Sequence, residues 1–447
     1  ATSFKENSSP DGSYDKSRLV GFFGNVNYGY DNRYFLDLSF RTDGSSKFGR
    51  NSRFAPFWSV GVAWNVHKEA FWSGDEKSSL KLRASVGSTG TTNFSSTQAL
   101  TTYNYDFSKI YNGVFGVSLA GYGNPELKWQ NTISYNVGVD MTLLKGLVTF
   151  NGDFYIKNTE NLLLPLTVAP STGFSSYVEN IGKLRNTGIE GRLRLNLIRD
   201  TQRDLRWNVT LSAFHNKSKI TKLSNQLEEI NKYANSDWYN QGTVVYRQYE
   251  AGRSQTALMM VRSGGIDPAT GNEVYIKRNG ELTFEYDAND KVKCGDMKPT
   301  IEGNVNTNLT WKGFTLYMLF KYQFGAKAYN GTLASKVEGA NPYKNADKRV
   351  LYDRWKEPGD HAKFRRIDDR TSPYQTTRLV FDNDLFSLSS VSLSYELPRE
   401  ISQKIYADRV RLMLSTTDVF RLSTIKQERG TSYPFARTFN LSLNVTF

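Results

Sequence analysis

The residue types that most often carry catalysis or bind metals are few in this chain and stand far apart. The three histidines are His67, His215 and His361, and the one cysteine is Cys294. A tetrahedral zinc site draws on several cysteine, histidine or carboxylate ligands at close spacing. We therefore expect structural or solvated roles for the histidines, and the lone cysteine excludes an internal disulfide bond. We predict no metal site and no bound cofactor.

The acidic side chains also form no arrangement typical of an active site. Asp368-Asp369 and Glu228-Glu229 fall in polar stretches, whereas glycosidase carboxylates need an apolar pocket that separates their pKa values. Asp287, Asn289 and Asp290 could offer oxygen ligands to Ca²⁺, but the spacing of an EF-hand is lacking. The HExxH, GxSxG and Walker patterns are absent from the sequence. We predict that the chain is not an enzyme.

Aromatic side chains in the long polar stretches are more suggestive of ligand contact. Aromatic rings offer the apolar ring faces of sugars a large flat surface on which to stack. The candidates for substrate contact are Tyr103, Tyr105, Tyr111, Trp238 and Tyr239. Packing within a loop or against a partner protein would use the same residue types, so both interpretations stay open here.

The composition favours a β-barrel that crosses a membrane. The chain has 447 residues, of which 38% are hydrophobic and 14% aromatic, with 26 Tyr and 27 Phe. Its mean hydropathy is -0.53, and no stretch approaches the roughly 20 apolar residues of a membrane helix. A barrel combines low hydropathy with many aromatics because only alternate residues meet lipid.

The net charge of +13 is spread along the chain rather than clustered. A nucleic-acid binder concentrates its basic residues in a patch or stripe. We therefore predict no nucleic-acid partner, and expect the lysines and arginines to line a polar lumen or meet anionic lipopolysaccharide.

Period-two alternation recurs from end to end and is typical of half-buried strands. Ile133, Val137 and Met141 fall on one face of a segment whose other face holds Asn136 and Asp140. A soluble sandwich would not keep ionised groups in the middle of strands that long. The pattern predicts about 13 membrane-spanning strands at 18–30, 33–43, 56–67, 80–90, 131–144, 147–163, 183–198, 205–221, 301–312, 314–326, 380–397, 408–421 and 435–447.

The connections alternate between short and long, as in outer-membrane barrels. Tight turns are expected at Asp31-Asn32, Lys145-Gly146 and Lys312-Gly313, and long polar loops near 92–124, 165–181, 224–298 and 328–378. We assign the strand-like pieces of 255–286 to an extracellular loop. A spanning strand there would break the alternation of short turns on one side of the membrane with long loops on the other. An odd strand count would place Ala1 outside and Phe447 in the periplasm, whereas single-chain bacterial barrels have even counts. We therefore expect the last part of a larger barrel.

Several segments, in order, resemble the SusC/RagA family of TonB-linked outer-membrane transporters. They are Asp43–Gly49 with Pro56–Asn65, Asn124–Trp129, Asn186–Gly191, Gly265–Gly271, Arg354–Trp355 with Pro358–Asp360, and Tyr433–Phe447. The resemblance implies an all-β transmembrane antiparallel barrel of about 22 strands, with residues 1–447 as its C-terminal portion. It places a plug domain, a TonB box and the first strands upstream.

The resemblance also implies a function. It predicts active import of a bulky nutrient across the bacterial outer membrane, and favours an oligosaccharide over a peptide. The implied partners are a SusD-like surface lipoprotein, the TonB-ExbB-ExbD complex acting through the upstream region, and outer-membrane lipid. The alternative is a binding or structural barrel that does not transport, or an adhesin.

The last residue is expected to act as an assembly signal. Phe439, Leu441, Leu443, Val445 and Phe447 share one face of an amphipathic terminal segment. We predict that deleting Phe447 lowers the amount of folded barrel in the outer membrane. Heat-modifiable migration on gels measures that amount, and normal abundance of the folded form in the deletion variant would contradict the prediction.

Overall fold

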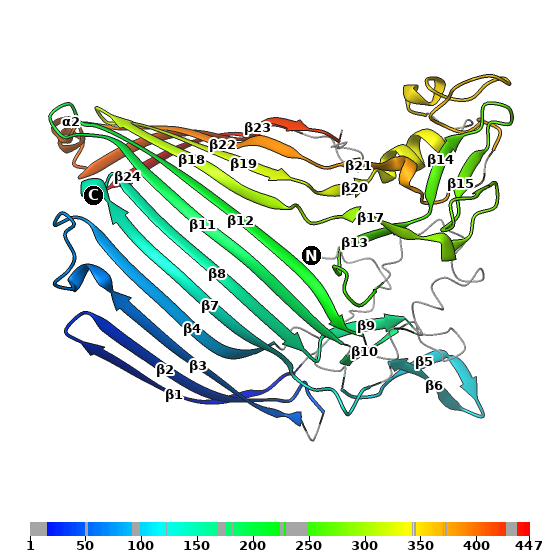
Figure 1. Cartoon of the computed structure of the whole chain (residues 1–447), viewed down its shortest axis with the longest axis horizontal. Helices are drawn as coiled ribbons and strands as arrows, with labels where there is room; N and C mark the ends of the chain where they lie inside the picture. The colour runs from blue at the N-terminus through cyan, green and yellow to red at the C-terminus, as the bar shows by residue number, and fades with distance from the viewer. Residues whose placement is uncertain are drawn as a thin grey trace.

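The chain forms one large curved sheet with smaller sheets at one end. The computed structural model describes residues 16–49, 52–91, 99–121, 123–167, 176–180, 182–223, 228, 249–341, 343, 346–369, 371, 373–425 and 436–447. Within these residues the main sheet has 13 strands, and each strand pairs antiparallel with its neighbours in the order β1-β2-β3-β4-β7-β8-β11-β12-β18-β19-β22-β23-β24. The strands run obliquely, and the sheet curves into a wall (Figure 1).

The strands of the main sheet confirm the 13 predicted spans. Their bounds are β1 (Leu19–Tyr30), β2 (Tyr34–Ser45), β3 (Phe54–Asn65), β4 (Ser79–Thr91), β7 (Gln130–Leu143), β8 (Val148–Glu160), β11 (Lys183–Asp200), β12 (Leu205–Lys222), β18 (Ile301–Trp311), β19 (Phe314–Phe324), β22 (Leu385–Glu396), β23 (Arg409–Ser423) and β24 (Phe439–Thr446). Many are 11–14 residues long and β11 and β12 have 18 residues each, which exceeds the usual strand length in soluble sheets.

Three predicted strand bounds are wrong. The predicted span 435–447 begins too early, because residues 436–438 precede β24 and are not part of it. The other two are wrong for local reasons. The predicted span 380–397 contains two elements, because Val380–Asp382 forms the short strand β21, which pairs with β20 (Lys327–Tyr329) outside the main sheet. The chain then changes partners, and β22 begins at Leu385. The predicted span 147–163 is too long, because Asn161 adopts a φ of 53° and this left-handed conformation ends β8 at Glu160.

The turns at one end of the wall are short, as predicted. Asp31 and Asn32 have φ values of 50° and 52°, and Lys312 and Gly313 have values of 46° and 84°. Positive φ at both central residues gives the turn whose twist matches the flanking strands. Lys145-Gly146 lies in the 3₁₀ turn η3 (Leu144–Gly146). The helix α2 (Arg399–Lys404) joins β22 to β23 at this same short-turn end (Figure 1).

The other end of the wall, called here the long-loop end, carries the insertions. Its paired strands are β5 (Thr102–Tyr111) with β6 (Val114–Gly121), β9 (Leu163–Thr167) with β10 (Ser176–Asn180), β13 (Ala257–Met260) with β17 (Val292–Asp296), and β14 (Arg262–Ile266) with β15 (Glu273–Ile276) and β16 (Leu282–Thr283). The assignment of 255–286 to a loop outside the spanning sheet is confirmed.

The helical segments that lie within the described residues are all short. Besides η3 and α2 they are η2 (Val66–Lys68), η5 (Ala288–Asp290), the π-helical η6 (Leu333–Glu338), η7 (Lys348–Leu351) and η8 (Thr377–Leu379). Across the described ranges, no helix is both long and apolar enough to span a bilayer.

The two faces of the wall differ sharply in chemistry. On the apolar face, the register aligns Val137, Phe154 and Ile189, and these side chains are 60%, 46% and 58% exposed. One position along, on the polar face, the register aligns Arg83, Gly138, Asp153, Glu190, Phe214 and Glu302 in one row across six strands. A continuous exposed apolar face backed by a charged one is typical of a barrel wall between lipid and a polar lumen.

The wall has two free edges in the part of the chain that the structure describes. β1 pairs only with β2 and β24 only with β23, and every residue of β1 is exposed. The two edge strands do not pair with each other, so these 13 strands do not close into a small barrel.

The face assignment makes a testable distinction between neighbouring residues. Val137→Arg, in the full-length protein, should lower the free energy of unfolding by about 2–4 kcal/mol because a charge then meets the bilayer interior. Asn136→Arg, one residue away on the polar face, is the matched control and should be tolerated. Urea titration in lipid vesicles measures both, and the reverse ranking would show that the faces are inverted.

Candidate functional site on the polar face and loops

A tyrosine that crosses a glycine shapes the polar face near the long-loop end. Tyr155 of β8 pairs with Gly188 of β11, which pairs in turn with Asn216 of β12. The Tyr155 hydroxyl donates a hydrogen bond of 3.1 Å to Asn216 Oδ1. A Cβ on Gly188 would lie 2.4 Å from the Tyr155 ring, so only glycine lets the ring pass over β11. The bridge thus ties three strands together.

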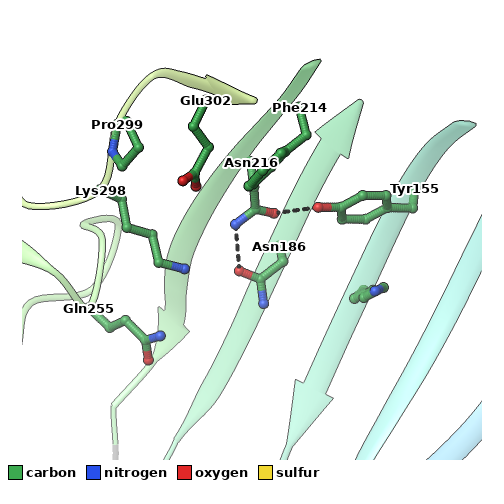
Figure 2. A pocket seen from close by; sticks show the side chains of 9 residues that line it. Tyr155, Asn186, Phe214, Asn216, Gln255, Lys298, Pro299 and Glu302 are labelled. Carbon is green, nitrogen blue, oxygen red and sulfur yellow. Dashed lines mark hydrogen bonds between the residues drawn. The ribbon is translucent and has the colours of Figure 1, made fainter. Parts of the chain in front are cut away.

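A pocket of about 320 Å³ opens beside this bridge, and we call it the wall pocket. Asn216 Nδ2 lies 3.5 Å from Asn186 Oδ1, which extends the polar chain from Tyr155. Figure 2 shows Lys298 and Gln255 entering from the loop side, facing Asn186 and Asn216. The full lining is Tyr155, Lys157, Asn186, Phe214, Asn216, Gln255, Lys298, Pro299 and Glu302.

The charged groups of the wall pocket are not neutralised by one another. Lys157 Nζ lies 4.6 Å from the centre of the Tyr155 ring, a cation–π contact. Over the described ranges, no ion pair joins Lys157, Lys298 or Glu302 to an oppositely charged side chain. Two ammonium groups and one carboxylate therefore face the pocket with their charges uncompensated within the wall.

A second charged cluster lies on the same face, and its groups are already paired. Arg83 Nε donates to Asp140 Oδ2 at 2.7 Å, and its Nη2 donates to Asp153 Oδ2 at 3.1 Å. Asn151 Nδ2 donates a further hydrogen bond to Asp140 Oδ1 at 2.8 Å. The cluster joins β4, β7 and β8, and we interpret it as a brace of the wall.

The insertions at the long-loop end are held by buried charges. Arg378 Nη2 contacts Glu338 Oε2 at 2.6 Å and Glu273 Oε2 at 3.0 Å, and both glutamates are 1% exposed. Arg365 Nε contacts Glu338 Oε1 at 2.9 Å. Burial would lower the pKa of Arg378, but the two carboxylates outweigh it and hold the pKa above its ordinary value. The network joins residues from β15, η6 and η8 into one body.

Arg354 completes this loop body by binding backbone carbonyl groups. Its guanidinium donates to the carbonyl oxygens of Val350 and Arg365 at 3.0 and 2.8 Å, and also to that of Val337. These bonds satisfy a guanidinium that is buried without a carboxylate of its own. The segments around β15, η6 and Arg354 therefore form a defined platform rather than separate loops.

The sequence candidates for substrate contact lie apart from the wall pocket. Tyr103, Tyr105 and Tyr111 are on β5, in a hairpin that projects from the long-loop end (Figure 1), and they are 63%, 71% and 87% exposed. Trp238 and Tyr239 lie outside the described residues. The role of these five residues therefore stays a prediction. Phe447 is 84% exposed just beyond β24, on its apolar face.

The histidines and acidic loop residues take local roles where the structure describes them. His67 Nδ1 lies 3.0 Å from the carbonyl oxygen of Leu80, and His215 Nδ1 contacts the carbonyl of Thr300. Asp287 caps η5 by accepting a bond from the amide of Asn289. Among the described residues, no three histidine, cysteine or acidic side chains gather as metal ligands.

Sequence reasoning missed the wall pocket because its members are distant along the chain. Gln255 and Lys298 come from an insertion, whereas Lys157, Asn186 and Asn216 come from three strands. One signal was present in the sequence. Tyr155 and Phe214 are aromatic residues whose neighbours on the same face of the strand are polar. Such positions stand out only once the faces of all neighbouring strands are aligned.

Comparison with protein families gives one match that covers most of the chain. A family model described as TonB dependent receptor-like, beta-barrel matches residues 2–330. TonB-dependent receptor P3 of Formosa agariphila is 28% identical over 480 aligned positions, which cover 98% of this chain and 46% of that protein. TonB-dependent receptor SusC of Bacteroides thetaiotaomicron is 25% identical and covers 81% of this chain and 38% of that protein. The chain thus spans less than half the length of these relatives.

Comparison with solved structures gives the same fold. The RagAB peptide transporter superposes with a TM-score of 0.79 at 24% identity, covering 92% of this chain and 45% of that one. The RagAB peptide importer in its closed-closed state gives a TM-score of 0.77 at 25% identity, covering 91% of this chain and 44% of that one. The curved 13-stranded wall is therefore an arrangement shared with these larger barrels.

The crossing of Tyr155 over Gly188 can be tested by adding one methyl group. Gly188→Ala should displace the ring and break the bond to Asn216, which lowers the free energy of unfolding by about 1–3 kcal/mol. Gly61→Ala is the matched control, because its Cβ would meet Asp37 Cβ at an ordinary 3.7 Å on the same polar face. Urea titration of the full-length protein in lipid vesicles compares the two, and equal effects would rule out a special role for the crossing.

Proposed function

The chain belongs to the TonB-dependent receptor β-barrel family, and we propose that it forms the C-terminal part of the wall of a nutrient importer. Proteins of this family and of the SusC type lie in the bacterial outer membrane, and this protein is an outer-membrane receptor or transporter of that type. Its named relatives are receptors and transporters rather than enzymes. The cargo that we propose is a bulky nutrient, with an oligosaccharide favoured over a peptide.

The observation that carries the proposal is the two-faced wall of 13 neighbouring strands. Backbone groups at a free sheet edge cost several kcal/mol each in a bilayer, so β1 and β24 require further strands beside them. Completion to about 22 strands gives a lumen wide enough to be plugged. The polar face would then line the lumen, and residues 1–447 would be barrel alone, with the plug domain in the rest of a longer polypeptide.

The proposed mechanism divides the work between this chain and its partners. The wall and the loop body would hold the cargo at the long-loop end, under a SusD-like surface lipoprotein. The upstream region would carry the plug and would couple it to TonB, ExbB and ExbD, which transmit the energy of the proton gradient. A partnership of this kind is supported by the likeness to SusC and to the barrel of RagAB, a peptide transporter by its name.

A second candidate is a surface barrel that binds a partner without transporting it. The loop body favours this candidate as much as it favours import, since segments joined by buried ion pairs can also serve as a docking surface. Import requires energy from the cell, whereas binding alone does not. The two candidates therefore differ in their dependence on the proton gradient.

Growth and uptake measurements separate the two candidates. A strain lacking the full-length protein should lose growth on one polymeric nutrient from a panel of glycans and proteins, and the intact gene should restore it. Uptake of a fluorescent derivative of that nutrient should stop when TonB is inactivated or a protonophore is added. Unchanged growth on every nutrient, or uptake that continues without TonB, would contradict the import proposal.

A further inference from the structure

The wall pocket combines three kinds of recognition in one small volume. Lys157 and Lys298 supply positive charge, Asn186 and Gln255 supply amide groups, and Phe214 supplies an aromatic ring. Phe214 is 40% exposed although it lies at a position of the polar face. Glu302, the directly paired residue on β18, adds one carboxylate.

We propose that the wall pocket binds an acidic sugar unit of the cargo, through a carboxylate or sulfate group held by Lys157 and Lys298. This inference rests on the proposed import function and gives its cargo a chemical class. Two lysines against one glutamate leave the pocket with an excess of one positive charge. Ammonium groups that lack an ion-pair partner gain a charge-assisted hydrogen bond when an oxyanion enters.

The neutral groups of the pocket fit the remainder of a sugar. Each asparagine side chain has two N–H donors and an acceptor oxygen with two lone pairs, and the bonds among Tyr155, Asn216 and Asn186 use only part of that capacity. The free capacity of Asn186, together with Gln255 and the Glu302 carboxylate, suits adjacent hydroxyl groups. The Phe214 ring offers the apolar face on which a sugar ring stacks.

The strand pairing argues for a sugar rather than an extended peptide. Peptides commonly add to a sheet through backbone hydrogen bonds at a free edge. Beneath the wall pocket β8 pairs with β7 and β11, and β12 pairs with β11 and β18. Lys157, Asn186 and Phe214 each pair with a neighbouring strand on both sides, so recognition at these positions falls to the side chains.

The location suits a ligand that enters from the long-loop end. Lys157 lies three residues before the end of β8, and Asn186 three residues after the start of β11. At about 3.3 Å per residue, Lys157 and Asn186 lie roughly 10 Å along their strands from the long-loop ends of β8 and β11. A chain of sugar units passing along the polar face would meet this pocket early.

The test measures binding to the full-length transporter in detergent with paired probes. The carboxylate probe is a galacturonate tetrasaccharide, with its carboxyl-reduced form as neutral partner. The sulfate probe is a carrageenan tetrasaccharide, with its desulfated form as neutral partner. We expect at least one acidic probe to bind about tenfold more tightly than its partner, and the probe that does so identifies the acid group.

Three variants test which residues cause the preference for the acidic probe. Lys157→Gln combined with Lys298→Gln should abolish the preference for the acidic form, and Phe214→Ala should weaken both forms. Lys81→Gln is the matched control, because Lys81 lies on the polar face of β4, where its Nζ lies 5.3 Å from the centre of the Phe35 ring, and is not part of the pocket. This control should keep the preference.

Several outcomes would overturn the inference. They are the absence of a preference for either acidic probe, a preference that survives the double substitution, and tight binding of pentaglutamate in place of both sugars. The last result would assign the pocket to acidic peptides. None of these outcomes decides whether the protein imports a nutrient, because that proposal is tested separately by TonB-dependent uptake in living cells.

Discussion

The whole structure depends on one constraint, which is that a backbone crossing a bilayer must satisfy its own hydrogen bonds. Between the two free edges, thirteen strands meet it by pairing antiparallel with their neighbours. Because successive side chains then point to opposite sides, one face is given to lipid and the other to polar groups. Charged groups such as Arg83 and those of the wall pocket are tolerated on the polar face because it does not pack into an apolar core.

The same pairing determines which side chains lie close together on the polar face of the wall. Cross-strand neighbours lie only about 5 Å apart, so residues from four strands meet in the wall pocket, where Gln255, Lys298 and Pro299 of an insertion join them. Glycine adds a further device, since Gly188 lets the ring of Tyr155 reach Asn216 across an intervening strand. The side chains that the strands contribute to the wall pocket are therefore positioned by the strand register.

The wall could be predicted from the sequence, but the wall pocket could not. Alternation and turn residues such as Lys312-Gly313 are local signals, and they identified every strand of the main sheet. A predicted strand bound was wrong where a segment with strand-forming residues pairs outside the main sheet. Val380–Asp382 is such a segment, because it pairs with β20. Lys298 and Asn216 meet only through the fold of an insertion, and Arg378 finds Glu273 from more than a hundred residues away, distances that no local pattern encodes.

The contrast between the two ends of the wall has a consequence for chain entropy. Closing the connection of roughly 80 residues between β12 and β18 costs only about 3 kcal/mol more than closing the two-residue turn at Lys312-Gly313, since closure entropy grows with the logarithm of length. That difference is comparable to the contribution of a few satisfied hydrogen bonds. Insertions at the long-loop end can therefore lengthen, shorten or exchange their contents while the wall keeps its register, so a new cargo can be accommodated by altering one end of the molecule.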